Sequence, residues 1–381
     1  MAPLGVGVLL NPIAGFGGTL ALHGTDRLPE GRFDEAVAAG RAERRLIRAV
    51  EGLGRPDAAA ELLAPPGLLG GRALSTAGIA HRVLDAPVPS PRERTRRTDT
   101  IAAARALRDA GVCCIVFAGG DGTATDIAEA IGTDVPVIGV PSGVKMHSEV
   151  FARSPEAAGR LLSQFLHGSR ESAIVEVLDV GPDDRTGVVA ELRAPRAREP
   201  LQGAKSSARP QDGAAARRTI ARELIAASGD ATTWVLGPGT TTGALAAELG
   251  FAATLRGVDV RHPSGDIELD VDEARLYEIA RDAAEPHLVL GVVGGQGFLL
   301  GRGNQEISTR VIGRIGADRV SIVAAEEKIG GLFPPVLLID VDDDRRATGD
   351  GDRRPHPLEG YRRVCTGARQ SSVMRVIDAA A

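Results

Sequence analysis

Aromatic side chains are scarce in this sequence: Phe, Tyr and Trp together make up 3% of 381 residues. The hydrophobic fraction is nevertheless 43%, so we expect a core built mainly from Ala, Val, Leu and Ile. The length suits two domains, because a domain typically has roughly 100–200 residues. The low aromatic content therefore restricts which side chains fill the core, while leaving the core a normal size.

Cysteine is rarer still, with three residues, of which Cys113 and Cys114 are adjacent. This number and spacing exclude a disulfide framework and a cysteine-based metal site. We expect the cysteines to be small buried residues of a protein in a reducing compartment.

Long hydrophobic runs are also missing, since no stretch approaches the roughly 18 apolar residues of a membrane span. The first residues, MAPLGVGVLLNPIAG, lack a basic region, and their apolar run is too short for a signal peptide. The net charge of −5 gives no electrostatic reason to expect nucleic acid or a membrane as a partner. We therefore expect a cytoplasmic protein.

Two common nucleotide-binding signatures are absent as well. No segment has the form G-x-x-x-x-G-K-[ST], which excludes a P-loop protein. The segment GVGVLLNPIAG does not place G-x-G-x-x-G between a strand and a helix, as dinucleotide-binding folds require. Any phosphate site in this chain must therefore be built differently.

The sequence does contain alternating strand and helix patterns. Continuous apolar runs at 4–10, 112–120 and 135–143 are typical of buried parallel strands. Helical spacing of apolar residues at 42–53 and 98–111 predicts helices between them. This alternation predicts a Rossmann-like parallel sheet with right-handed crossovers.

The pattern changes near residue 172. The segments SAIVEVLDVG and RTGVVAELRAP read as strands without an intervening helix, and α/β alternation returns later in the chain. We therefore expect an N-terminal α/β domain over 1–172 and a β-rich α/β domain over 173–381. An alternative in which the last segment returns to the N-terminal domain stays open.

Three glycine-rich turns follow apparent strands: Asn11 to Gly18, Gly119 to Thr123, and Gly237 to Thr242. At the carboxyl ends of parallel strands such turns direct backbone N–H groups toward a ligand, and a helix N-terminus adds partial positive charge for a phosphate. A single turn of this kind is also explained by ordinary helix capping. Three of them together favour phosphate binding.

Asp121 lies inside the second turn, where its carboxylate would repel a phosphate unless it had its own task. Two tasks are consistent with its position: activating an acceptor hydroxyl as a general base, or holding Mg²⁺ against the phosphates. The alternative is an Asp that only hydrogen-bonds its own turn. The residues alone leave these alternatives open.

Several segments carry a resemblance to a known family. GGDGTATDI resembles the G-G-D-G-T motif of the kinase superfamily of NAD kinases, diacylglycerol and sphingosine kinases, and more distantly 6-phosphofructokinases. NPIAGFGG, VIGVPSGVKMHSEVFA, VLGPGTTTGALAAELG, GGQGFLLGRGNQEIS and GYRRVCTG narrow the similarity to the ATP-NAD kinase-like family that contains the acetoin-catabolism X proteins. The resemblance extends from Gly5 to about Gly367.

The resemblance implies two domains with the site in the cleft between them, and transfer of a phosphoryl group to a hydroxyl. It implies that Asp121 is the catalytic residue that engages the acceptor hydroxyl. The nucleotide- and phosphate-binding residues that it implies are Asn11, Gly15, Gly17, Gly18, Gly119, Gly120, Gly122, Thr123, Gly237, Gly239, Thr240, Thr241 and Thr242.

The chain also departs from the family. We find no clear equivalent of the Asn-Glu pair of NAD kinases, and SGVKMHS replaces the family's usual turn after the third strand. Lys145 and His147 in this segment are therefore candidates for acceptor binding, although exposure or a plain polar contact would also explain them. Weaker acceptor-binding candidates of the same kind are Asp26, Lys205, Gln296, Arg302 and Asn304.

These observations predict an ATP-dependent small-molecule kinase that uses Mg²⁺, with NAD as the default acceptor. A kinase for another metabolite hydroxyl and a non-catalytic nucleotide-binding regulator remain alternatives. The donor (ATP, polyphosphate or another nucleoside triphosphate) and the metal-binding residues are left open. A homo-oligomer, dimer or tetramer, is expected because NAD kinases commonly form them.

Overall fold

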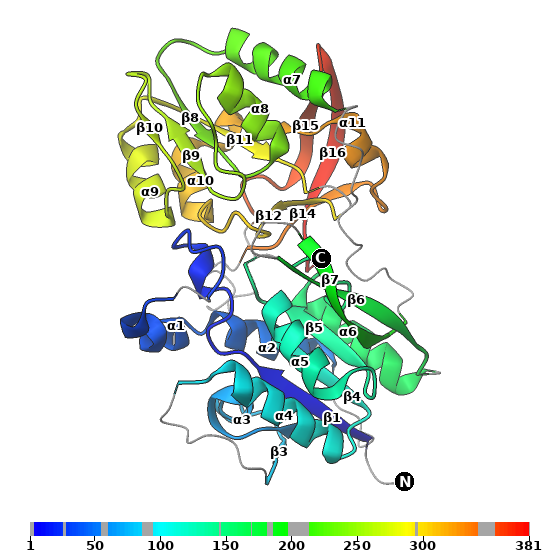
Figure 1. Cartoon of the computed structure of the whole chain (residues 1–381). Coiled ribbons are helices and arrows are strands. Elements are labelled where there is room, and N and C mark those ends of the chain that lie inside the picture. Colours follow the sequence, from blue (N-terminus) through cyan, green and yellow to red (C-terminus); the bar gives the residue numbers. More distant parts are fainter. Residues whose placement is uncertain are drawn as a thin grey trace. The chain divides into compact units, whose positions relative to one another are not determined.

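The computed structural model describes residues 4–25, 28–54, 60–85, 94–144, 146–168, 170–180, 186–196, 213–293, 296–341 and 355–380. The chain forms two compact units (Figure 1). The first unit comprises Met1–Phe16 and Gly24–Ala204, and the second comprises Gly17–His23 and Lys205–Ala379. No helix among the described residues is long and apolar enough to cross a membrane.

The first unit contains a five-stranded parallel sheet in the order β3-β2-β1-β4-β5. This is the order of the first five strands of dinucleotide-binding folds. The strands are β1 (Leu4–Leu10), β2 (Ala60–Ala64), β3 (Arg82–Val83), β4 (Cys114–Gly119) and β5 (Val137–Pro141). The predicted parallel α/β architecture is therefore confirmed.

Helices cover both faces of this sheet. On one face, Val8 and Val116 pack with α2 (Arg41–Gly52), α3 (Gly71–Thr76) and α6 (Pro155–His167). On the other face, Leu9 and Phe117 pack with α4 (Arg97–Asp109) and α5 (Asp121–Ile131). Neighbouring residues of a strand point to opposite faces, so two buried faces require the continuous apolar runs seen in the sequence.

The two strands expected after residue 172 form an antiparallel hairpin, β6 (Ser172–Val180) and β7 (Thr186–Pro195). Val177 and Leu192 of this hairpin are buried in the same core cluster as Phe117 and Ile127 of the first unit. The hairpin therefore belongs to the first unit, and the predicted boundary near residue 172 is corrected to a position beyond β7. Sequence patterns could not show which core the hairpin would join.

The second unit contains a nine-stranded mixed sheet in the order β10-β9-β8-β11-β13-β15-β16-β14-β12. Strands β8, β11, β13 and β15 are parallel neighbours, whereas β15 and β16 are antiparallel. The strands are β8 (Thr232–Leu236), β9 (Asp259–Arg261), β10 (Ile267–Glu268), β11 (Glu285–Gly291), β12 (Phe298–Leu300), β13 (Val320–Val323), β14 (Val336–Ile339), β15 (Gly360–Gly367) and β16 (Gln370–Asp378). The β-rich α/β character expected for this part is confirmed.

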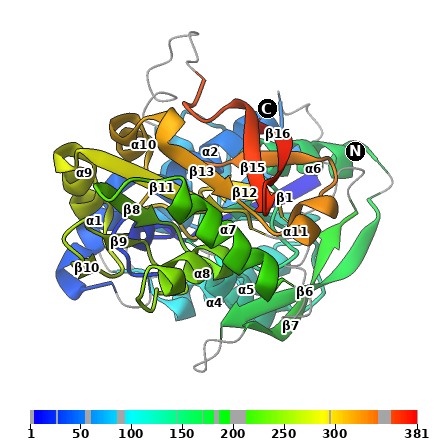
Figure 2. The same ribbon diagram turned by 90° about the horizontal axis from the view of Figure 1, so that it is seen from above.

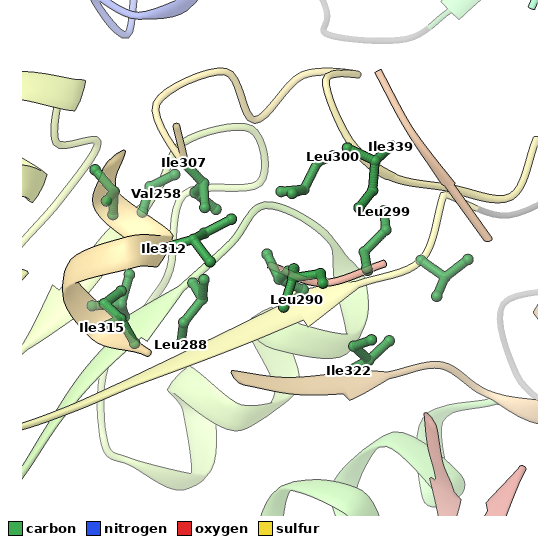
Figure 3. Close-up of a cluster of buried hydrophobic side chains, with 14 of the residues drawn as sticks. Val258, Leu288, Leu290, Leu299, Leu300, Ile307, Ile312, Ile315, Ile322 and Ile339 are labelled. Atoms are coloured by element: carbon green, nitrogen blue, oxygen red, sulfur yellow. The ribbon is translucent and has the colours of Figure 1, made fainter. Parts of the chain in front are cut away.

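Helices also pack on both faces of the second sheet (Figure 2). Trp234 and Val289 pack with α7 (Ala214–Ala226) and α8 (Thr240–Glu248). On the opposite face, Leu288 and Leu290 of β11 pack with Ile312 of α10, which spans Thr309–Ile315 (Figure 3). The remaining helices are α1 (Phe33–Ala39), α9 (Glu273–Asp282), α10 (Thr309–Ile315), α11 (Glu326–Gly330) and the short 3₁₀ helices η1 (Phe16–Gly18), η2 (Glu30–Arg32), η3 (Gly67–Leu69) and η4 (Ala317–Arg319).

The second unit differs from the sequence-based division at its start, whereas its final strands lie in the second unit as that division placed them. The final strands β15 and β16 pair inside the second sheet, so the alternative in which the last segment returns to the N-terminal domain is wrong. In the other direction, residues 17–23 join the second unit, where the Thr19 carbonyl accepts a hydrogen bond from the Glu273 amide (3.0 Å). His23 Nε2 lies 2.9 Å from Asp270 Oδ2 in the same unit.

Candidate functional site

The carboxyl ends of β1, β4 and β5 lie at one edge of the first sheet. From β1 the sheet extends to β2 on one side, and from β4 it extends to β5 on the other. Ligands of open α/β sheets bind beyond the carboxyl ends of strands at such a change of direction. Asn11 follows β1 and Gly120 follows β4, so two of the three glycine-rich turns flank this point.

Hydrogen bonds join the loops at this edge. Asn11 donates from its amide to the Ala118 carbonyl (2.9 Å) and from Nδ2 to Thr123 Oγ1 (3.1 Å). The Gly119 carbonyl accepts from the amides of Ser142 (3.0 Å) and Gly143 (2.9 Å). The loop after β1, the start of α5 and the loop after β5 therefore form one hydrogen-bonded assembly.

Helix α5 begins at this assembly. Gly120 is its N-cap and provides no side-chain cap, and Asp121 is its first residue. Within the described ranges, the amides of Gly122 and Thr123 donate to no hydrogen-bond acceptor. Unpaired amides together with the positive end of the helix dipole form a binding site for an anion such as phosphate.

Glycine occupies its positions in this region for different structural reasons. A Cβ at Gly15, whose φ is +81°, would lie 2.2 Å from the Ser142 carbonyl oxygen. A Cβ at Gly119 would lie 2.6 Å from the Thr123 side chain, and one at Gly120 would lie 3.2 Å from Gly143 Cα. A Cβ at Gly122 would meet no atom of the described residues within 4 Å. Close approach of the chain to itself therefore explains the first three glycines, whereas Gly122 faces open space beside the unpaired amides.

Gly17 and Gly18 do not share this environment. Both belong to the second unit, and a Cβ at Gly18 would lie 2.9 Å from Gln305 Cβ. Close packing against Gln305 thus accounts for glycine at position 18. Of the first predicted turn, the structure brings only Asn11 and Gly15 together with the Gly119–Thr123 turn.

Asp121 is held by the loop after β5. Its Oδ2 accepts from the His147 amide (2.7 Å), and its Oδ1 accepts from the Ser148 amide (3.0 Å) and Ser148 Oγ (2.6 Å). The residue is 7% exposed, and burial raises the pKa of its carboxyl from 3.8 to about 6, although the bonds from Ser148 and His147 oppose this change. A carboxyl with a pKa near neutrality is suited to accept a proton from a substrate.

Asp179 is an acidic residue of this region that sequence reasoning missed. It lies on β6, next to Leu178, whose amide donates to Ser148 Oγ (3.0 Å). The negative charge of Asp179 contributes to the raised pKa of Asp121. In the sequence, Asp179 is marked only as a carboxylate near the end of an apolar strand. Its place beside Asp121 depends on the packing of the hairpin on α5, which is a long-range contact and leaves no local pattern.

Two arginines of α2 bring positive charge to the same edge and were also missed. Arg41 Nη1 donates to the Gly15 carbonyl (3.1 Å), and the buried Arg45 donates from Nε to the Pro141 carbonyl. Both side chains thereby fix the loops after β1 and β5. Their charge also makes this edge more favourable for an anion.

The described residues contain no group of three or more His, Cys, Asp or Glu placed to hold a metal ion. Asp121 and Asp179 are the two acidic side chains shown to interact at the carboxyl edge of the first sheet. Mg²⁺ is often bound through one or two carboxylates together with water and substrate phosphates. The pair therefore fits a magnesium ion that arrives with its nucleotide, and does not fit one held by the protein alone.

The third glycine-rich turn lies in the second unit, between β8 and α8. Gly239 adopts φ +130°, a conformation that other residues rarely take, and Thr242 Oγ1 donates to its carbonyl (2.9 Å). Gly237, Gly239 and the three threonines that begin α8 are thus adjacent at the carboxyl end of one parallel strand. The structure confirms the predicted strand–turn–helix arrangement, whereas nucleotide binding by these residues stays a prediction.

Two of the acceptor-binding candidates, Arg302 and Asn304, lie in the turn after β12 of the second unit. Arg302 is buried in an ion pair with Asp340, and its guanidinium lies 4.3 Å from the centre of the Phe298 ring. Asn304 accepts from the Gly301 amide and donates to the Leu299 carbonyl, both at 2.9 Å. These contacts stabilise the turn after β12, so they give no support to acceptor binding.

Of the other acceptor-binding candidates, Gln296 is buried in the second unit, and His147 contacts Asp121 through its backbone amide. The predictions for Asp26, Lys145 and Lys205 lie outside the described residues.

Residues 74–170 match the family model of the ATP-NAD kinase N-terminal domain. Over these residues the chain is similar to the N-terminal domain of ATP-NAD kinases. The matching segment begins within α3 and extends past the end of α6, and therefore includes Asp121 and Ser148 but not Asn11 or Gly15. The predicted resemblance to ATP-NAD kinases is confirmed, whereas the narrower similarity to acetoin-catabolism X proteins stays a prediction. No curated protein and no solved structure matches the chain.

Proposed function

We propose that this chain is an ATP-dependent phosphotransferase that transfers a phosphoryl group to a hydroxyl, with NAD as the first acceptor to test. The observation that carries the proposal is the start of α5, where unpaired amides at Gly122 and Thr123 adjoin the buried carboxyl of Asp121. The ATP-NAD kinase match over the same residues supports it.

In this proposal the amides of Gly122 and Thr123 hold a phosphate of the donor, and the adjacent helix dipole stabilises its charge. Asp121 accepts the proton of the acceptor hydroxyl, since its Oδ2 receives one hydrogen bond from the described residues and an oxygen of this kind can accept two. Mg²⁺, brought with the nucleotide, would neutralise phosphate charge near Asp121 and Asp179.

Ser148 has a positioning role in this proposal. Its hydroxyl donates to Asp121 Oδ1 and accepts from the Leu178 amide, so it fixes the carboxylate relative to β6. Ser148→Ala should leave Asp121 with a higher pKa, because a hydrogen bond to the ionised form is lost. The pH at which turnover is half-maximal should therefore rise, and an unchanged pH profile would contradict the assignment.

A non-catalytic nucleotide-binding protein is the second candidate. It is favoured by the same three hydrogen bonds to Asp121, because they join α5 to the loop after β5 and so give the carboxylate a structural role without any chemistry. Titration of ATP into the protein, beside an assay for ADP release with NAD and with a panel of other hydroxyl compounds, separates the candidates. Binding without turnover on any acceptor would support the regulator, and turnover on another compound but not NAD would support a different kinase.

A further inference from the structure

The hairpin β15–β16 of the second unit has an exposed face that carries large apolar and basic side chains. Tyr361 lies opposite Arg375 in the antiparallel register, and two residues further along Arg363 lies opposite Val373. Because alternate residues of a strand share a face, all four side chains lie on one side of the hairpin. Tyr361 is 75% and Val373 is 70% exposed, and both arginines are exposed as well. We refer to these four residues as the arginine–tyrosine face.

The rest of the hairpin is covered. On its opposite side, Val364 and Met374 are buried in the core cluster of the second unit. On the same side as the arginine–tyrosine face, Cys365 packs against the core cluster beneath α7 and α8. The Arg369 amide in the hairpin turn donates to Glu223 of α7 (2.7 Å). Helix α7 therefore covers the turn end of the hairpin, and the described residues leave the arginine–tyrosine face open.

The two guanidinium groups of this face lack acidic neighbours. Arg363 and Arg375 form no ion pair and no side-chain hydrogen bond with any described residue. They are diagonal neighbours across the two strands, and side chains in that relation are about 7–8 Å apart. Two positive charges at this distance repel each other. A carboxylate placed on the face would turn this repulsion into attraction, so the charge pattern is complementary to an acidic partner.

We propose that the arginine–tyrosine face binds an acidic segment of another protein. Carboxylates of the partner pair with the two guanidinium groups, whose planar donors match a carboxylate, and an apolar side chain packs on Tyr361 and Val373. Tyrosine and arginine are also the residue types that contribute most to binding energy at protein interfaces. Val336, which is half-buried and lies beside Arg375 on β14, extends the apolar part of the surface.

A protein segment suits this face better than a nucleic acid. The face combines two charges with a valine and a tyrosine, whereas a nucleic acid presents a continuous row of phosphates to a chain of net charge −5. The proposal goes beyond the proposed function, because no residue of the face belongs to the candidate site.

The probe for this surface is a fluorescently labelled random copolymer of glutamate and tyrosine, titrated with the full chain and followed by fluorescence anisotropy. Polyglutamate, which lacks apolar side chains, and oligouridylate, a nucleic acid, are labelled in the same way for comparison. We expect the copolymer to bind most tightly, and its affinity to fall as the salt concentration rises, because exposed charges are screened. Absence of saturable copolymer binding, or tighter binding of oligouridylate, would overturn the proposal.

Two double variants place the binding on the surface. Arg363→Ser/Arg375→Ser should weaken copolymer binding about tenfold or more, because both partners of the carboxylates are removed. Arg105→Ser/Arg314→Ser is the matched control, since these arginines are also exposed, form no ion pair with a described residue and change the net charge equally. We expect the control to bind as the unaltered chain does. An equal loss in both double variants would show that net charge alone attracts the copolymer, and would overturn the proposal.

A second copy of the chain is the other possible occupant of this face. Sedimentation velocity compares the oligomeric state of the unaltered chain with that of Arg363→Ser/Arg375→Ser. We expect the same state for both, because the proposed partner is a different protein. Conversion of the variant to a smaller species would show that the face joins two copies, and would overturn the proposal. None of these measurements needs phosphoryl transfer, so their failure is distinguishable from failure of the proposed function.

Discussion

The buried carboxyl of Asp121 predicts a distinctive dependence of stability on pH. Its pKa is about 6 in the folded chain and 3.8 in its ordinary environment, because burial disfavours the ionised form. One pKa unit corresponds to about 1.4 kcal/mol, so the difference is equivalent to about 3 kcal/mol. The native state holds the proton more tightly than the unfolded state. The stabilisation is therefore fully present below pH 4 and is lost as the pH rises to about 6.

The perturbation is Asp121→Asn, which removes the charge and keeps the shape of the side chain. The amide group loses one bond from the His147 or Ser148 amides, which costs about 1–3 kcal/mol at every pH. The informative quantity is therefore the difference in unfolding free energy between the unaltered chain and the variant. We expect this difference to shift by about 2 kcal/mol between pH 4 and pH 7, with the variant gaining relative stability as the pH rises.

Urea unfolding followed by circular dichroism at several pH values measures this difference. The single tryptophan, Trp234, lies in the second unit, so its fluorescence follows the unfolding of that unit. A transition that is seen by circular dichroism and not by fluorescence is then assigned to the first unit. Asp134→Asn is the matched control, because the Asp134 side chain is 66% exposed and its replacement should shift the difference little. A difference that stays constant from pH 4 to pH 7 would refute a buried, raised-pKa carboxyl at position 121.

Three further results are expected. Gly122→Ala should raise the free energy of unfolding by up to about 1 kcal/mol, because Ala is a better helix former than Gly. The same variant should weaken ATP binding about tenfold or more, because its methyl group enters the space beside the unpaired amides. Gly313→Ala in α10 is the control, because its new methyl group also meets no atom of the described residues within 4 Å. Equal affinities of both variants for ATP, measured by calorimetric titration, would contradict a ligand site at Gly122. Phe151→Ala should lower the free energy of unfolding by about 3–5 kcal/mol, since Phe151 is fully buried and its ring centre lies 5.5 Å from that of Phe117. A loss under 1 kcal/mol in urea unfolding would show that this core is not closely packed. Ser148→Ala should move the pH profile of turnover upward, as set out above.

The sequence predicted the parallel strands of the first unit because they are buried on both faces. A strand such as β1 or β4 must then be apolar at every position, and this pattern is local and easily recognised. The start of α5 could also be predicted, since glycine and Asp121 directly follow a strand. These features depend on neighbouring residues only.

The features that were missed depend on contacts between distant residues. The hairpin β6–β7 carries the same alternating pattern whichever core it joins, so the boundary at 172 could not be corrected from sequence. Strands β15 and β16 expose Tyr361 and Arg375 on one side, which hides the buried Val364 and Val376 from a search for continuous apolar runs. In the candidate site, the partner of Asp121 is Ser148, 27 positions away, and no local pattern predicts that pair.

The most direct test of the proposed phosphotransfer is a single assay on the full chain. The protein is incubated with Mg²⁺, NAD and ATP carrying a labelled γ-phosphate, and labelled NADP is separated and counted, with Asp121→Asn in parallel. We predict labelled NADP from the unaltered chain and a rate about 10²–10⁴-fold lower from the variant, the range expected for loss of a general base. Equal rates of NADP formation from both proteins would contradict the central claim that Asp121 carries out the proton transfer.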